Sequence, residues 1–161
     1  MNFSLDNTPK RVYSIYRNKR KEKEEMKLKL LLIKVQDKPD VRIVNIEHSL
    51  QAFYETLECD TIDMVIREVC GKNYYFIIDD EGLLVDDPIP SVVTRIDGQT
   101  VVEIAGNILI GNVEYNDEEG CYELVSLQDE DIEAITERIL TLRSKSDSRS
   151  TPLSTPVLVL N

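Results

Sequence analysis

The sequence contains few of the residues that carry most enzymatic chemistry. Its one histidine is His48, which the pattern places at or near the start of a helix, with no identifiable acid or base beside it. The cysteines, Cys59, Cys70 and Cys121, are far apart and form none of the paired short spacings that zinc sites use. We therefore predict a protein that is not an enzyme and has no catalytic, cofactor-binding or metal-binding residues.

Long apolar runs are also missing. No stretch approaches the roughly 18 uninterrupted apolar residues of a membrane helix, and the N-terminus lacks the apolar core of a secretory signal. Three separated cysteines fit reduced thiols in a hydrophobic core better than a disulfide framework. The six glycines have the spacing of neither a phosphate-binding loop nor a dinucleotide fold. These absences predict a cytoplasmic protein that binds no membrane and needs no cofactor.

Charge is distributed unevenly along the chain, whose net charge is −11. Residues 1–25 hold seven basic and four acidic residues, which gives 7 − 4 = +3. Residues 26–142 give 9 − 25 = −16, and residues 143–161 give 3 − 1 = +2. A polyanionic domain repels nucleic-acid backbones, so RNA or DNA binding is disfavoured except through the basic N-terminal segment, where Tyr13 and Tyr16 lie among the cations.

These charges and the composition predict three segments. Residues 1–25 are expected to form a loosely ordered basic extension, and residues 26–142 a single acidic domain. Residues 143–161 are rich in Ser, Thr and Pro and are expected to form a flexible tail. The short apolar run at residues 157–160 could dock on this chain or add to a sheet of a partner. Met26 is close to the predicted start of the domain, and whether it is also the natural start stays open.

Hydrophobic periodicity predicts a succession of strands and hairpins. Residues 27–35 have an apolar centre flanked by lysines, which is typical of a buried strand. Asp97 and Gly98 have the composition of a two-residue hairpin turn, and residues 116–120 that of a longer turn. One short helix is predicted from apolar residues that share a face, namely Leu50, Phe53, Tyr54 and Leu57.

The last predicted element is a longer helix. Apolar residues recur there at intervals of three or four, at Ile132, Ile135, Ile139 and Leu142. Ser126 and Asp129 have the spacing of a capping box. The predicted fold class is therefore α+β: a mainly antiparallel mixed sheet of hairpins, with one short helix and a longer C-terminal helix packed on it.

Acidic residues gather in two predicted turns. A hard-cation site would need alternating oxygen ligands around a central glycine and a terminal glutamate, and these residues lack that spacing. Solvated turns explain the clusters more simply, and a basic partner would be attracted to them. The predicted partner-binding residues are Asp79, Asp80, Glu81, Asp86, Asp87, Asp117, Glu118 and Glu119.

Five stretches, taken in order, resemble one protein family. They are residues 27–35, 46–57, 75–83, 105–111 and 125–132. Together they resemble the family known as domain of unknown function 3846, whose members are small domains carried mainly by bacteriophages and conjugative elements. The resemblance implies a mobile-element origin and no known activity. The chain departs from the family pattern at Glu58-Cys59, where paired glycines are usual, and at Pro88-Ile89-Pro90-Ser91, where Pro-Asn-Arg is usual.

Three classes of function follow from these observations. The first is a non-enzymatic accessory protein of a phage or mobile element that binds a host protein with a basic surface, as a nucleic-acid mimic or an inhibitor of host defence. The second is a protein that sequesters a small ligand such as a nucleotide signal, or a structural or regulatory domain. A ligand pocket would need Gly106 and Gly111 at its wall and a convergence of cations from Lys27, Lys29, Arg42, Lys72 and Arg95. An enzyme is the third and least favoured class.

Overall fold

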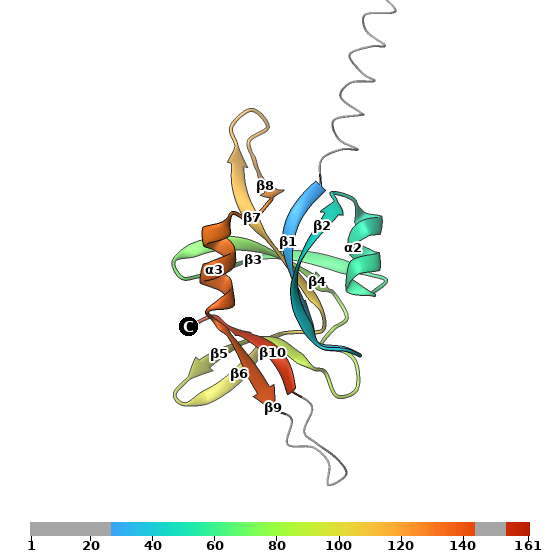
Figure 1. Cartoon of the computed structure of the whole chain (residues 1–161), viewed down its shortest axis with the longest axis vertical. Helices are drawn as coiled ribbons and strands as arrows, with labels where there is room; N and C mark the ends of the chain where they lie inside the picture. The colour runs from blue at the N-terminus through green and yellow to red at the C-terminus, as the bar shows by residue number, and fades with distance from the viewer. Residues whose placement is uncertain (1–26, 144–153) are drawn as a thin grey trace, which may run out of the picture.

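The computed structural model describes residues 27–143 and 154–161, and these form two β-sheets and two helices (Figure 1). The predicted basic extension at residues 1–25 lies outside the described residues, as does most of the Ser/Thr/Pro-rich stretch. No helix within the described ranges is long and apolar enough to cross a bilayer.

The first sheet has six strands and is antiparallel throughout. Its order is β2-β1-β7-β4-β3, with β8 paired to the distal half of β7. The strands are β1 (Lys27–Lys34), β2 (Asp40–Glu47), β3 (Ile62–Val69), β4 (Lys72–Asp79), β7 (Ile108–Asn116) and β8 (Cys121–Val125). Because β7 and β8 run on past the other strands, they project from the molecule as a hairpin (Figure 1).

The second sheet has four strands in the order β6-β5-β10-β9. They are β5 (Pro90–Ile96), β6 (Gln99–Ala105), β9 (Ile139–Arg143) and β10 (Ser154–Val159). Strand β10 runs parallel to β5 and antiparallel to β9, so residues that follow the predicted domain boundary at 142 complete this sheet. The apolar run at the C-terminus thus docks on its own chain, and Val157, Leu158 and Val159 are buried there.

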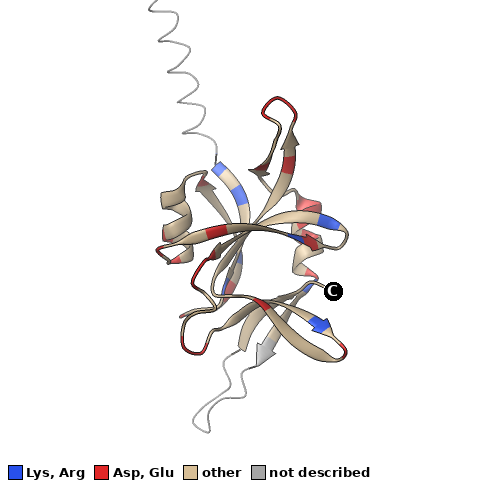
Figure 2. Cartoon of the chain, turned by 180° about the vertical axis from the view of Figure 1, so that it is seen from behind, with Lys and Arg blue, Asp and Glu red and all other residues tan. Residues whose placement is uncertain are grey.

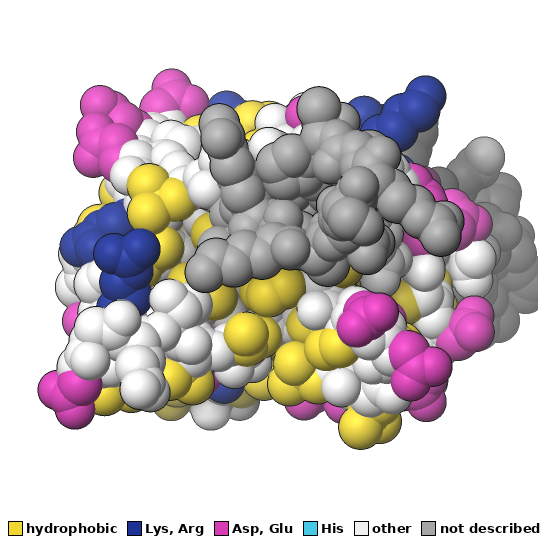
Figure 3. Space-filling model, turned by 90° about the horizontal axis from the view of Figure 1, so that it is seen from below, with side chains coloured by type: hydrophobic (Ala, Val, Ile, Leu, Met, Phe, Trp, Pro, Cys, Tyr) yellow, Lys and Arg dark blue, Asp and Glu magenta, His cyan; other side chains and the backbone are white. Residues whose placement is uncertain are grey.

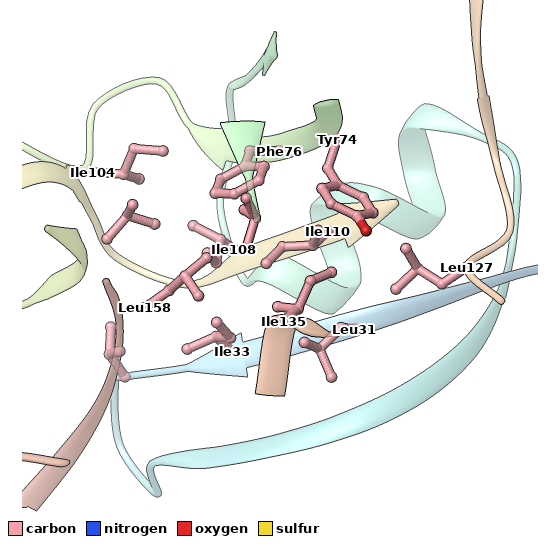
Figure 4. Packing of buried hydrophobic residues seen from close by; sticks show 13 residues of the cluster. Leu31, Ile33, Tyr74, Phe76, Ile104, Ile108, Ile110, Leu127, Ile135 and Leu158 are labelled. Carbon is pink, nitrogen blue, oxygen red and sulfur yellow. The ribbon is translucent and has the colours of Figure 1, made fainter. Parts of the chain in front are cut away.

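The main core lies between the two sheets. One face of the first sheet contributes Ile33, Phe76 and Ile108, and the second sheet contributes Ile104 and Leu158 (Figure 4). Helix α3 (Asp129–Thr136) adds its buried Ile135 to the same cluster. Side chains alternate across a strand, so every second residue of β1 enters this core and the others face the opposite side.

Helix α2 (Leu50–Leu57) covers that opposite side of the first sheet. Its Phe53 and Leu57 pack on Leu30 and Leu32 of β1, as predicted. Leu50 of the same predicted face is 61% exposed, so the apolar face is shorter than the spacing indicated. Ser49 caps the helix, because its side chain accepts a hydrogen bond from the Ala52 amide at 3.2 Å. Because apolar side chains cover both faces of β1, successive residues of this strand are apolar, as in its continuous run of leucine and isoleucine.

The predicted α+β fold with a longer C-terminal helix is wrong. The described chain is mostly β, with ten strands, and α3 ends at Thr136 after eight residues, the same length as α2. Residues 139–143 form β9 because β10 offers them a strand edge, pairing from Ser154 opposite Arg143 to Leu158 opposite Ile139. Residues 139–142 are Ile-Leu-Thr-Leu, and so short a run of apolar and β-branched residues is as compatible with a strand as with a helix.

Two local predictions also need correction. The cap of α3 is at Gln128, whose amide donates to the Asp131 carboxylate at 2.8 Å, while Ser126 accepts from the Lys29 amide at 2.9 Å instead of capping the helix. Cys70 and Cys121 are exposed and only Cys59 is partly buried, so the cysteines are not core residues as a group. The hairpin turns at Asp97-Gly98 and at residues 116–120 are confirmed.

Candidate functional site

The predicted acidic residues lie in two separate turns. Asp79 ends β4, and Asp80, Glu81, Asp86 and Asp87 lie in the connection from β4 to β5. We call residues 79–88 the acidic loop. The others, Asp117, Glu118 and Glu119, form the tip of the β7–β8 hairpin. Figure 2 shows the two groups in red at different places on the molecule: the hairpin tip at one end, and the loop beside the junction of the two sheets. The fold therefore does not bring the eight carboxylates together.

Short hydrogen bonds determine the conformation of the acidic loop. Asp79 accepts from the Glu81 amide through its side chain at 2.9 Å and from the Gly82 amide through its carbonyl at 3.1 Å. The Asp80 amide donates to the Thr61 carbonyl at 3.3 Å, and the Leu84 amide to the Glu81 carbonyl at 3.0 Å. These bonds hold the first half of the loop, from Asp79 to Leu84, in one conformation.

Gly82 attaches this loop to the second sheet. The residue is buried, and a Cβ atom there would collide with the backbone carbonyl of Ala105 at the end of β6. Only glycine permits so close an approach of two backbones. Gly106, which follows, has a φ of +89° and lies against Gly82 and Asp79. Glycine at position 106 therefore serves the packing of this loop.

The acidic loop also carries three consecutive exposed aliphatic side chains, which are not among the predicted partner-binding residues. Leu83, Leu84 and Val85 are 52%, 81% and 48% exposed. The structure places them in the turn and bend between β4 and β5. Isolated exposed apolar residues are ordinary, whereas three exposed in succession are less common. In the sequence, this apolar triplet lies between acidic residues and is followed by Pro88. That position between turn residues could have indicated that the triplet is exposed.

Acidic and hydrophobic side chains also lie side by side on the surface that carries the second sheet. Figure 3 shows exposed hydrophobic side chains among carboxylates when the molecule is seen from this end. The acidic loop belongs to this end, since it leads from β4 into β5. An apolar centre with charged residues around it is the arrangement of many protein–protein interfaces.

The β7–β8 hairpin carries a different set of groups. Tyr115 and Tyr122 pair across the strands with ring centroids 5.1 Å apart at 69°, and both are at least half exposed. Glu119, Cys121 and Glu123 hold ligand atoms within 4.8 Å of one another. Carboxylates of this kind are common on protein surfaces without a metal, and the geometry by itself identifies no ion.

A buried carboxylate joins α3 to the first sheet. Asp131 is 4% exposed and accepts from Lys72 Nζ at 2.7 Å, the Tyr74 hydroxyl at 2.9 Å and Asn112 Nδ2 at 3.3 Å. Burial alone would raise the pKa of Asp131, but hydrogen bonds from Lys72, the Gln128 amide and Tyr74 outweigh it, so the pKa is lowered. Burial, together with the bond to Asp131, raises the pKa of Tyr74. At neutral pH Asp131 is therefore ionised and Tyr74 protonated, which suits a hydrogen-bonded contact that holds α3 on the first sheet.

Three of the five cations proposed for a ligand pocket are paired with carboxylates. Lys29 and Lys72 pair with Asp129 at 3.2 Å and Asp131 at 2.7 Å in the first turn of α3, and Arg42 lies 4.0 Å from Asp40 on β2. A Cβ atom at Gly111 would collide with the side chains of Leu124 and Leu30, so that glycine makes room for core packing. These contacts give no support to a small-ligand pocket lined by these residues.

Cys59 and His48 lie on either side of α2 in the sequence. Burial, followed by the nearby charge of Asp79, raises the pKa of the Cys59 thiol to about 11, so the thiol is protonated at neutral pH. His48 is exposed just before α2, with its ring centroid 6.0 Å from that of Phe53.

A family model described as Domain of unknown function (DUF3846) matches residues 26–140. The matched region runs from the start of β1 into β9, and it leaves out most of β9 and all of β10. It confirms the resemblance found in the sequence. No curated protein and no solved structure matches the chain.

Proposed function

Since the chain belongs to the Domain of unknown function (DUF3846) family, whose description assigns no activity, we propose a function from the acidic loop. The protein is a non-enzymatic domain that binds a partner protein with a basic surface. The observation that carries this proposal is the exposed triplet Leu83-Leu84-Val85, held between carboxylates on a loop that its own hydrogen bonds organise.

The two parts of the loop have different roles in the proposed complex. Carboxylates attract a basic partner at long range and reject acidic ones, so they act mainly on the association rate and on specificity. Leu84 enters an apolar pocket of the partner, because burying an exposed leucine stabilises a contact by about 1.5–3 kcal/mol. A partner pocket rimmed by Lys or Arg satisfies both requirements.

The family resemblance supports a host protein as the partner of a phage or mobile-element protein. Mimicry of duplex nucleic acid receives less support, since that function needs an extended row of charges and the two acidic turns lie apart. An inhibitor of host defence that uses a local apolar anchor remains part of the proposal.

The first test concerns charge. Neutralising the loop with Glu81→Gln, Asp86→Asn and Asp87→Asn should weaken binding about tenfold in about 0.15 M salt, as expected for a few rim charges. The partner is captured from host lysate, identified and purified, and its Kd is measured by calorimetry at several salt concentrations. The matched control removes the same charge from the hairpin tip with Asp117→Asn, Glu118→Gln and Glu119→Gln. Equal losses in both triple variants would contradict a localised site.

The second test concerns the apolar anchor. Leu84→Ser should weaken binding of the same partner about 10- to 100-fold, which corresponds to the loss of one buried leucine. This loss should persist in about 1 M salt, where the surface charges are screened. Leu50→Ser, at a leucine that is 61% exposed at the start of α2, is the matched control and should leave the Kd unchanged. Unaltered binding by the Leu84 variant would refute the role of the triplet.

A further inference from the structure

Strand β6 forms an outer edge of the second sheet, and its first half, from Gln99 to Val102, carries none of the usual protection of such edges. Exposed edges invite pairing with another chain, and proteins guard against this with charges, prolines or bulges. The first sheet follows this rule, since β2 and β3 carry three charged residues each. Strand β6 contains no proline, and its one charged residue is Glu103, which accepts from the Thr94 hydroxyl at 3.1 Å on the same hairpin. Its pairing with β5 is regular from Gln99 to Val102 and shifts register only beyond Val102, at Glu103.

The free edge of β6 is also apolar. Val101 and Val102 are 42% and 40% exposed at its centre. Within the ranges that the structure describes, β6 pairs only with β5, so its other side has no strand partner. The hairpin of these two strands lies at the margin of the lower sheet in Figure 1.

The turn determines which backbone groups of β6 point outward. Asp97 and Gly98 have φ values of 51° and 78°, as a type I′ two-residue turn requires. Such a turn makes Ile96 and Gln99 a hydrogen-bonded pair. Pairs alternate along an antiparallel ladder, so Thr100 and Val102 direct their N–H and C=O groups away from β5.

Contacts on the other side of β5 support this alternation. Arg95, which faces Thr100, uses its N–H and its C=O to bond the Asn161 side chain, both at 2.9 Å. Val93, which faces Val102, accepts from the Leu160 amide at 3.0 Å. Since the backbones of Arg95 and Val93 point away from β6, those of their cross-strand neighbours point away from β5.

The backbone N–H and C=O groups of β6 that point away from β5 can form hydrogen bonds with those of a second copy of the same strand. In an antiparallel pair about a two-fold axis at Val101, Thr100 lies opposite Val102 of the second copy and Val102 opposite its Thr100. Each of these two pairs exchanges two backbone hydrogen bonds. Val101 faces its own counterpart across the axis. Gln99 faces Glu103, an amide beside a carboxylate, so no like charges stand opposite one another.

We propose that this protein forms a homodimer through antiparallel pairing of β6 with β6 of a second copy. The two second sheets become one continuous eight-stranded sheet, and the acidic loops stay free on both copies. This inference is independent of the proposed function, because it uses a different edge of the molecule. Each chain has a net charge of −11, so repulsion between the copies opposes the dimer and salt favours it. Partner binding at the acidic loop has the opposite salt dependence.

Sedimentation equilibrium of the full chain tests the proposal. A monomer–dimer equilibrium is expected on the order of 100 μM protein, because one strand pair buries little surface, with more dimer in about 0.5 M salt than in low salt. Val101→Lys places two ammonium groups opposite each other and should weaken dimerisation at least about tenfold. Ile66→Lys, at a similarly exposed position on the edge strand β3, should leave it unchanged. A monomer at every salt concentration, or equal dimerisation of the Val101 variant, overturns the proposal.

A disulfide tests the register. The exposed Cys70 and Cys121 are first replaced by serine. In that background V101C should form an interchain disulfide under mild oxidation. Residue 101 of one copy lies opposite residue 101 of the other, and a non-hydrogen-bonded pair brings their Cβ atoms close. V102C in the same background should form at least about tenfold less interchain disulfide, because Thr100 of the second copy, and not a cysteine, lies opposite residue 102. Equal cross-linking of both variants, or none, overturns pairing about Val101.

Discussion

Replacing Asp131 with asparagine is expected to lower the free energy of unfolding by about 2–3 kcal/mol, the range for breaking a buried, hydrogen-bonded ion pair whose cation is partly in water. Asp131 is buried and joins the start of α3 to Lys72, Tyr74 and Asn112 on the first sheet. Asparagine has one acceptor oxygen, so a buried donor would lose its partner. Urea denaturation followed by circular dichroism measures the loss.

The control for this prediction is Asp129→Asn in the same turn of α3. The Asp129 side chain is 91% exposed and pairs with Lys29 at 3.2 Å, so its removal should cost less than about 0.5 kcal/mol. Equal destabilisation by the two substitutions would show that the helix dipole, and not the buried cluster, stabilises α3.

The same carboxylate predicts a pH dependence. The pKa of Asp131 is lowered in the folded state, so the unfolded state takes up its proton first as pH falls. The contribution of the ionised Asp131 to the free energy of unfolding is therefore complete above about pH 5. It is lost as the pH falls through the pKa of the unfolded chain, about 3.9, and then through the lower pKa of the folded state. The Asp131→Asn variant should lose less stability than the unsubstituted protein between about pH 5 and pH 2. Parallel slopes in urea titrations across that range would contradict the assignment.

Replacing Asn107 with alanine is expected to cost about 2–4 kcal/mol, because it leaves several buried backbone groups without partners. Asn107 is buried before β7, where its Oδ1 accepts from the Val35 amide at 2.9 Å and the Gln36 amide at 3.3 Å. Its Nδ2 donates to the Leu57 carbonyl at 3.1 Å at the end of α2. One side chain thus connects three segments that are far apart in the sequence.

Urea denaturation and hydrogen exchange together check this second prediction. The free energy of unfolding should fall, and the Val35 amide should lose its protection before the amides at the centre of β1. Asn45→Ala on the exposed strand β2 is the matched control and should cost less than about 0.5 kcal/mol. A stable Asn107 variant with a protected Val35 amide would mean that water or backbone movement replaces the lost bonds.

Part of the candidate site followed from local composition. Carboxylates beside glycine and proline, as at Glu81, Gly82 and Asp87, favour exposed turns wherever the chain folds. The exposure of Leu83, Leu84 and Val85 could not be inferred in the same way. An aliphatic triplet suits a strand unless its backbone is held elsewhere, and here the contact of Gly82 with Ala105 keeps it in a turn.

By itself the sequence determined the acidic character of the domain, the buried β1, the buried Phe53 and Leu57 of α2 and the hairpin turns, because each depends on interactions between near neighbours. Only the tertiary structure decided that residues 139–143 pair with the C-terminal strand instead of continuing α3, and that Asp131 belongs to the interior. The physical reason is the same in both cases. Pairing and burial depend on partners distant in the chain, and the periodicity of a short segment contains no information about where those partners lie.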